Sequence, residues 1–151
     1  MKTYKSKFGY GIIGFVVLIL SSILLFMIYQ NESTETIVSV AGIHLLVLGF
    51  CLYLNFSTKY TITDQGLLKV RCGFLYSKEI DVMKIKSIKK SNNLISSPAP
   101  SLDRVEVAYG KYDVVIISPK KKVEFADHLT QINPSIENCI DGIRNPSKYG
   151  I

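Results

Sequence analysis

The sequence SSPAPSLDR, residues 96–104, decides how the polar part of this chain is organised. Its two prolines, Pro98 and Pro100, lack a backbone N–H and fix φ, so the segment cannot pair inside a sheet. A lysine-rich run precedes the segment and a strongly β-branched run follows it. We therefore interpret it as a stiff corner between two parts of one sheet, with Asp103 and Arg104 at the start of the next strand.

Before this corner, apolar residues alternate with polar ones, which is the period of a β-strand. The predicted strands are residues 59–63 and 67–72, followed by one or two more strands over residues 76–80 and 82–90. The first two form a hairpin, because Asp64-Gln65-Gly66 between them is a turn sequence. In the last one, Ile85 and Ile88 are three residues apart, which suits a helical turn as well as a bulged strand. We favour the strand, with Ile80, Val82, Ile85 and Ile88 as the buried set.

After the corner, residues 104–109 alternate cleanly, Gly110 and Lys111 can turn, and residues 112–118 are mostly β-branched. This pattern predicts a second hairpin whose later strand is buried on both faces.

A helix is expected next, with Ser118 as its N-cap and Pro119 at its first position. It carries an apolar stripe suited to covering one side of a small sheet, formed by Phe125, Ala126, Leu129 and Ile132. The helix should end near Asn133 and Pro134. Isoleucines at helical spacing in the tail, Ile136, Ile140 and Ile143, predict a further turn or two of helix before a frayed end.

Two uncharged apolar stretches, residues 9–29 and 37–56, occupy the first third of the chain. About 20 residues at 1.5 Å each span about 30 Å, the thickness of the hydrocarbon core of a bilayer. We predict two transmembrane helices joined by the short loop QNESTET as a tight antiparallel hairpin. A cleaved signal peptide is disfavoured, because the first stretch is too long and a second follows directly.

The predicted fold class is α+β: two transmembrane helices, a small antiparallel sheet or barrel of five or six strands, and a helix that caps it. The domains are a transmembrane hairpin (1–56), a soluble domain (57–135) and a partly disordered helical tail (136–151). The pleckstrin-homology (PH) superfold is one architecture that has this order of elements.

Basic residues dominate the soluble part, which from residue 57 onward has 15 Lys and Arg and 10 Asp and Glu, or 15 − 10 = +5. The lysines cluster at two places, Lys84, Lys86, Lys89 and Lys90, and Lys120, Lys121 and Lys122. Beneath an anionic leaflet such clusters contact lipid headgroups or another ligand. A solvated face that follows the charge bias of membrane proteins explains them as well. No nucleic-acid partner is predicted, because no recognition motif is present.

Chemistry-bearing residues are sparse. Three cysteines, Cys51, Cys72 and Cys139, lack metal or redox spacing. His44 lies in the second apolar stretch, where a hydrogen bond to Ser21, Ser22 or Ser39 is its simplest role. Gly42 and Gly49 of the same stretch are expected at the contact between the two spans. His128 falls on the polar side of the last helix without a nucleophile context. We therefore predict no catalytic, cofactor or metal site.

Four segments together resemble a bacterial PH-like family often called the YyaB-like PH domain: YTITDQGL, IDVMKIKSIKKS, SSPAPSLDRVEV and VVIISPKKKVEFADHLTQINP. The signature in the corner is Ser97, Pro98, Ala99, Ser101 and Arg104. The resemblance implies a cytoplasmic PH-like barrel, roughly residues 59–134, tethered by membrane helices. A more distant likeness in layout is to PH-like immunity proteins that protect bacteriocin producers.

Orientation follows from the lysines that precede the first span, Lys2, Lys5 and Lys7, and from the acidic loop with Glu32 and Glu35. Both termini are expected on the cytoplasmic side of a bacterial plasma membrane. The predicted function is a membrane-tethered interaction module that binds a protein, a peptide or an anionic headgroup. The alternative is a protective protein, similar to bacteriocin immunity proteins, that acts through its spans.

Overall fold

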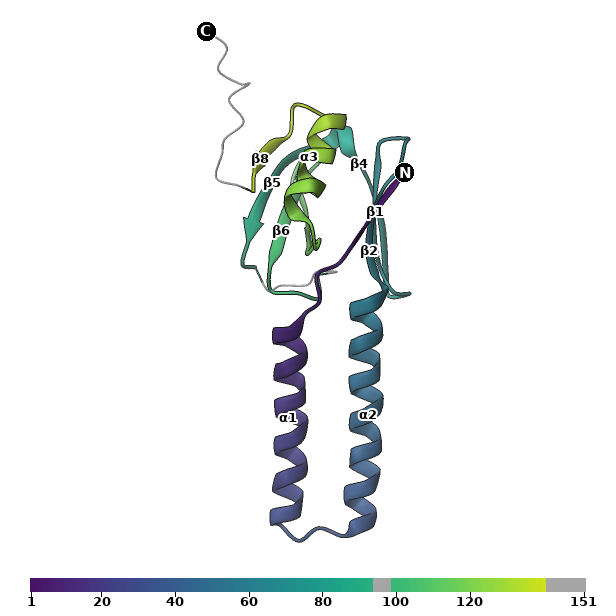
Figure 1. Cartoon of the computed structure of the whole chain (residues 1–151), viewed down its shortest axis with the longest axis vertical. Helices are drawn as coiled ribbons and strands as arrows, with labels where there is room; N and C mark the ends of the chain where they lie inside the picture. Colours follow the sequence, from purple (N-terminus) through teal and green to yellow (C-terminus); the bar gives the residue numbers. More distant parts are fainter. Residues whose placement is uncertain (94–98, 141–151) are drawn as a thin grey trace.

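The computed structural model describes residues 1–93 and 99–140 (Figure 1). Two long helices project from one end of a small domain built from two sheets and a third helix. The elements in chain order are β1 (Lys2–Lys5), α1 (Tyr10–Tyr29), α2 (Thr34–Ser57), β2 (Thr58–Ile62), β3 (Leu67–Cys72), β4 (Tyr76–Asp81), the 3₁₀ turn η1 (Val82–Lys84), β5 (Ile85–Ser91), β6 (Arg104–Tyr109), β7 (Asp113–Ile117), α3 (Lys122–Ile132) and β8 (Glu137–Cys139).

The helices α1 and α2 lie antiparallel and side by side (Figure 1), and both are long and apolar enough to cross a membrane. Ser33 caps the start of α2 by accepting a hydrogen bond from the backbone N–H of Thr36 at 3.2 Å. The predicted contact between the helices at Gly42 and Gly49 is wrong, because a Cβ built on either glycine would meet nothing within 4 Å. Both glycines therefore face away from α1.

The first sheet has the strand order β1-β2-β3-β4, all antiparallel. β2, β3 and β4 match the expected strands, and Gly66 takes the positive φ (+74°) that the predicted turn requires. β1 was not predicted. It consists of residues that precede α1, and its register with β2 places Lys5 opposite Lys59.

This strand lies within the range predicted for the transmembrane hairpin. The sequence assigned residues 1–56 to the hairpin, whereas Lys2–Lys5 completes the first sheet. The only buried residue of β1 is Tyr4, which is 5% exposed and packs edge-on against Phe125 with ring centroids 5.3 Å apart. The two long helices are thus inserted between adjacent strands of one domain, because β1 ends before α1 and β2 begins directly after α2.

The second sheet has the order β7-β6-β5-β8. The ambiguous region before it divides into the 3₁₀ turn η1 and the strand β5, whose register shifts between Ile85 and Ser87 as a bulge does. The buried set Ile80, Val82, Ile85 and Ile88 is confirmed, each at most 2% exposed. β7 is less buried than predicted, because Val114 is 48% exposed.

The helix α3 lies between the two sheets (Figure 1) and buries Phe125, Ala126 and Leu129, as its apolar stripe predicts. Its predicted start is wrong: the N-cap is Lys121, and Ser118 and Pro119 instead pair with the segment before α1. The predicted helical tail is also wrong as far as residue 140. Ile136 is 2% exposed, and β8 pairs with β5 in parallel, so the tail extends the sheet. Ile143 lies outside the described residues.

Candidate functional site

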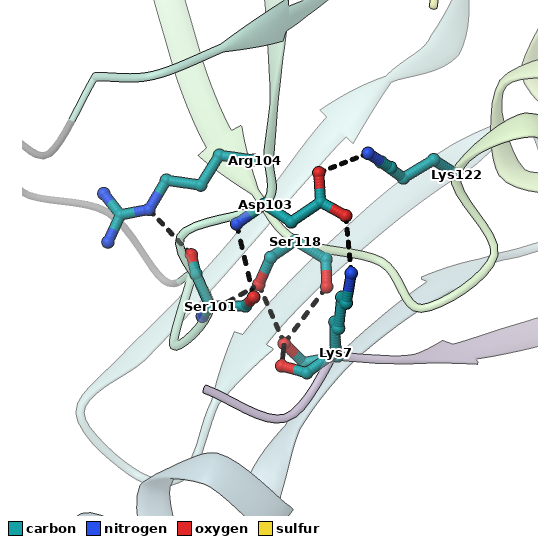
Figure 2. Close-up of polar contacts among 7 residues, drawn as sticks. Lys7, Ser101, Asp103, Arg104, Ser118 and Lys122 are labelled. Atoms are coloured by element: carbon teal, nitrogen blue, oxygen red, sulfur yellow. Dashed lines mark hydrogen bonds and ion pairs between the residues drawn. The ribbon is translucent and has the colours of Figure 1, made fainter. Parts of the chain in front are cut away.

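The described part of the corner after β5, residues 99–104, lies at the helix-proximal end of the domain, the end where α1 begins and α2 ends (Figure 1). Here Ser118 joins three segments (Figure 2). Its Oγ lies 2.9 Å from the Oγ of Ser6 and accepts a hydrogen bond from the Ser101 N–H at 3.4 Å. Its own N–H donates to the hydroxyl oxygen of the fully buried Tyr60 at 3.0 Å. The segment before α1, the corner and the end of β7 are therefore held together.

Asp103 adds two ion pairs to this junction (Figure 2). Its carboxylate binds Lys122 at the start of α3 and Lys7, whose Nζ lies 2.8 Å away. The hydrogen bond from Lys122, followed by that from Lys7, lowers the pKa of Asp103 below its ordinary value. Asp103, which stands directly before β6, thus links the corner, α3 and the segment that leads into α1.

Arg104 is 6% exposed although it carries a full charge. Its Nε donates to the Ser101 carbonyl at 2.9 Å, and a terminal guanidinium nitrogen donates to the Asn93 carbonyl at 2.8 Å. Asn93 and Ser101 stand before and after residues 94–98, so Arg104 fastens the corner at both sides. Of the signature residues, Ala99 is also buried, whereas Ser97 and Pro98 lie outside the described residues.

The same corner packs against the root of α1, which is itself bonded to α2. The Gly9 N–H donates to the Asn55 side-chain oxygen at 2.9 Å, which joins the N-cap of α1 to the last turns of α2. A Cβ on Gly9 would collide with the carbonyl of Pro100. Only glycine fits there, because the backbone of the corner approaches the helix so closely. The signature loop thus has the contacts of a structural element that fixes the helices to the domain.

The seven predicted lysines do not form one surface. Lys84 and Lys86 lie at the distal end of the domain, because the Lys84 carbonyl accepts from the N–H of Gly110 in the β6–β7 turn. Together with Met83, Ser135 and Glu137 they line an open groove of about 620 Å³. Lys89, on the same strand, pairs with Glu106 at 2.9 Å, and Lys90 is exposed nearer the helices.

Two of the three lysines in the second cluster form ion pairs, with acids that also bind Lys2 and Lys7. Lys121 pairs with Glu124 at 2.8 Å and Lys122 with Asp103, whereas Lys120 is exposed. Lys121, followed by Lys2, lowers the pKa of Glu124 to about 2. These pairs fasten β1 and the corner to the start of α3.

The comparison with family models decides what this domain is. The model described as Bacterial PH domain matches residues 58–133, which is half of the chain and runs from β2 to the end of α3. The chain belongs to the bacterial PH domain family. No curated protein and no solved structure matches it. PH domains are generally non-catalytic interaction modules, and this chain contains such a module.

The family match begins after α2, so the strand β1 comes from outside it. The strand β1 also completes a row of cations that the sequence patterns did not predict. Lys5, Lys59 and Arg71 stand side by side on β1, β2 and β3 at the helix-proximal end of the PH domain. The register of the β2–β3 hairpin would have paired Lys59 with Arg71. No local sequence pattern could have added Lys5 to this pair, because the two long helices separate β1 from β2 in the sequence.

The histidines differ from the prediction. Ser22 and Ser39 donate to carbonyls of their own helices, and within residues 1–93 and 99–140 the Nδ1 of His44 has no hydrogen-bond partner. His128 is not simply solvated, because its Nδ1 lies 3.1 Å from the Tyr4 hydroxyl. Among the residues that the structure describes, no group of three or more His, Cys, Asp or Glu side chains is arranged to hold a metal ion.

Proposed function

We propose that this protein is a membrane-anchored PH-type interaction module, with α1 and α2 across a bacterial plasma membrane and the PH domain and both termini in the cytoplasm. The observation that carries this proposal is the insertion of two long, apolar, uncovered helices between adjacent strands of one domain. No flexible linker separates the helices from the sheet, since β2 begins at the residue after α2. The module is therefore fixed in orientation as well as in place.

The exposed surface of the helices supports a bilayer as their environment. Large apolar side chains such as Phe15, Leu18, Leu45 and Leu46 are 65–76% exposed. Apolar surface of this extent is costly in water and is normal for a helix that faces lipid. α1 alone has 20 residues, so its length of about 30 Å matches a bilayer core.

Charge supports the orientation. Lys2, Lys5 and Lys7 lie on the domain side of α1, whereas the connection between the helices carries Glu32 and Glu35. The positive-inside rule places the side rich in lysine in the cytoplasm. Because β1 and β2 are paired strands, both roots of the hairpin must lie on the same side.

The distal groove is the surface that such a module would present to a protein partner. Lys84 and Lys86 lie about 20 Å along β5 from its helix-proximal end, at 3.3 Å for each residue. That distance exceeds a Debye length of about 8 Å, so these lysines would contribute little to attraction by the bilayer. They instead favour an acidic segment of a cytoplasmic partner by charge complementarity.

Cysteine accessibility tests the topology. In a variant without its native cysteines, Cys51, Cys72 and Cys139, we would introduce either Glu32→Cys in the helix connection or Asp64→Cys in the distal β2–β3 turn. A membrane-impermeant maleimide added to intact cells should label only Glu32→Cys, and both sites after lysis. Labelling of Asp64→Cys in intact cells, or release of the protein from membranes by alkaline carbonate, would contradict the proposal.

A further inference from the structure

Three cations stand in one row on the outer face of the first sheet. Lys5 on β1 is in register with Lys59 on β2, and Lys59 with Arg71 on β3. All three side chains are exposed. Lys120 extends the row at the level of the backbone, because its N–H donates to the Lys5 carbonyl at 3.0 Å. We call Lys5, Lys59 and Arg71 the cationic row.

No acid neutralises this row within the described part of the chain, since none of its members takes part in an ion pair there. The next outward-facing row on the same strands is different. Thr3 and Thr61 share a hydrogen bond of 3.0 Å, and Lys69 pairs with Glu79 at 2.7 Å. Like charges directly across strands destabilise a sheet, so the uncompensated row calls for an external anion.

An exposed apolar turn lies beside the row. Phe74 and Leu75, between β3 and β4, are 71% and 58% exposed. The Phe74 ring lies 6.5 Å from that of Phe50 and 6.0 Å from that of Tyr53, both on α2. Phe50 is seven residues before the end of α2, which corresponds to about 10 Å along the helix axis. Phe74 therefore reaches past the domain to the apolar part of the helix.

The cationic row and the Phe74–Leu75 turn are close in sequence and linked by a hydrogen bond. Arg71 is three residues before Phe74, and its Nε donates to the Gly73 carbonyl at 3.3 Å. Lys59 is two residues beyond the end of α2. The cationic row thus lies on the domain side of Phe74, whose ring lies beside α2. A phospholipid has the complementary order, with an anionic phosphate outside its acyl chains.

We propose that the cationic row and the Phe74–Leu75 turn form a binding site for an anionic phospholipid of the leaflet that faces the domain. The phosphate is held by Lys5, Lys59 and Arg71, and the upper acyl chain packs on Phe74 and Leu75. This inference rests on the proposed membrane anchoring. It gives the PH domain a lipid site that depends on a strand from outside the family match.

Tryptophan fluorescence offers a direct test, because the chain has no tryptophan. The full-length variant Phe74→Trp would be reconstituted in vesicles of phosphatidylcholine and phosphatidylglycerol, with bromine on the acyl chains of one lipid or the other. Bromine quenches tryptophan only at short range, so quenching reports which lipid is adjacent. We expect brominated phosphatidylglycerol to quench several-fold more than brominated phosphatidylcholine, since each cation contributes about fivefold in local affinity.

Matched variants separate the row from general charge. Adding Lys5→Gln, Lys59→Gln and Arg71→Gln should reduce the preference to nearly equal quenching by the two lipids. Adding Lys69→Gln, on the same face but in the neutralised row, should leave it unchanged. Because all of these side chains are exposed, the fold should persist, and circular dichroism would check it. Equal quenching by the two brominated lipids in the Phe74→Trp parent would overturn the proposal. So would a triple variant that is still quenched more strongly by brominated phosphatidylglycerol, to the same extent as its parent.

A second reporter, Leu46→Trp, lies in the middle of α2, where the native side chain is 76% exposed. If brominated lipid quenches this reporter but not the one at Phe74, the membrane anchoring stands and the lipid site is refuted. If neither reporter is quenched, the anchoring itself fails, and the lipid site fails with it.

Discussion

The insertion of the helical hairpin between β1 and β2 predicts which fragment of this protein folds. Residues 58–151 alone contain the family match but lack β1, so they should be unstable. Residues 1–7 joined to residues 57–151 by a short Gly-Ser linker should form a stable, soluble domain. The linker can be short, because the Ser6 N–H already donates to the Thr58 carbonyl at 3.2 Å.

The expected difference follows from what β1 contributes. Removing a buried aromatic side chain such as Tyr4 costs about 3–5 kcal/mol. Backbone hydrogen bonds add about 0.5–1.5 kcal/mol each, and β1 has four residue pairs with β2. With about one hydrogen bond for each pair, the sum is roughly 5–11 kcal/mol, which is comparable with the whole stability of a small domain, about 5–15 kcal/mol. The fragment without β1 should therefore be largely unfolded or aggregated.

Urea denaturation followed by circular dichroism would compare the two fragments, with Tyr4→Ala in the joined fragment as a control. The control keeps the length and backbone of β1, and should lose about 3–5 kcal/mol. A cooperative transition of equal midpoint for residues 58–151 and the joined fragment would refute the reasoning. So would a Tyr4→Ala variant as stable as its parent, since Tyr4 carries about half of the calculated loss.

Three further predictions concern the junction. Tyr60→Phe leaves the buried Ser118 N–H without its acceptor, which should cost about 1–3 kcal/mol and lower the melting temperature of the joined fragment measurably; an unchanged melting temperature would contradict the assigned bond. Arg104→Met removes the donors to the Ser101 and Asn93 carbonyls, which should lower the melting temperature of the joined fragment with the sheets intact by circular dichroism; an unchanged melting temperature would argue against the clamp. The pKa of Glu124 is lowered from 4.5 to about 2, so its ion pairs stabilise the fold above pH 4.5 and lose this effect as the pH falls toward 2. Glu124→Gln should therefore make the stability of the fold depend less on pH between 4.5 and 2. An unchanged pH dependence in this range would show that the pairs do not stabilise β1.

Local periodicity was sufficient for most elements. The uncharged lengths of the two spans, the alternation in residues 67–72 and 104–109 and the stripe on α3 each reflect contacts that repeat every two or 3.6 residues. Residues 82–90 contain both a helical turn and a strand, and Ile85 and Ile88 lie in the strand, as favoured. A 3₁₀ turn precedes a bulged strand, and the same isoleucines are buried in either form.

Errors arose where a residue's role depends on a distant segment. Ser118 has the side chain of a helix cap, yet it bonds to Ser6 and Tyr60 because β1 passes beside it. Ile136 and Ile140 suit a helix by spacing. The free edge of β5 instead offers hydrogen bonds to a strand. Propensity is a weak preference, and these tertiary contacts exceed it.

The sequence by itself determined the two apolar helices, the order of the strands from β2 to β7, the capping helix and the family. Only the tertiary structure decided that residues 2–5 belong to the PH domain, and that Lys5, Lys59 and Arg71 meet at the root of the helices while Lys84 lies at the far end. The physical reason is that β1 is short, with one buried residue and a partner strand more than fifty residues away. Its place is fixed by pairing and closure of the sheet, which no local pattern encodes.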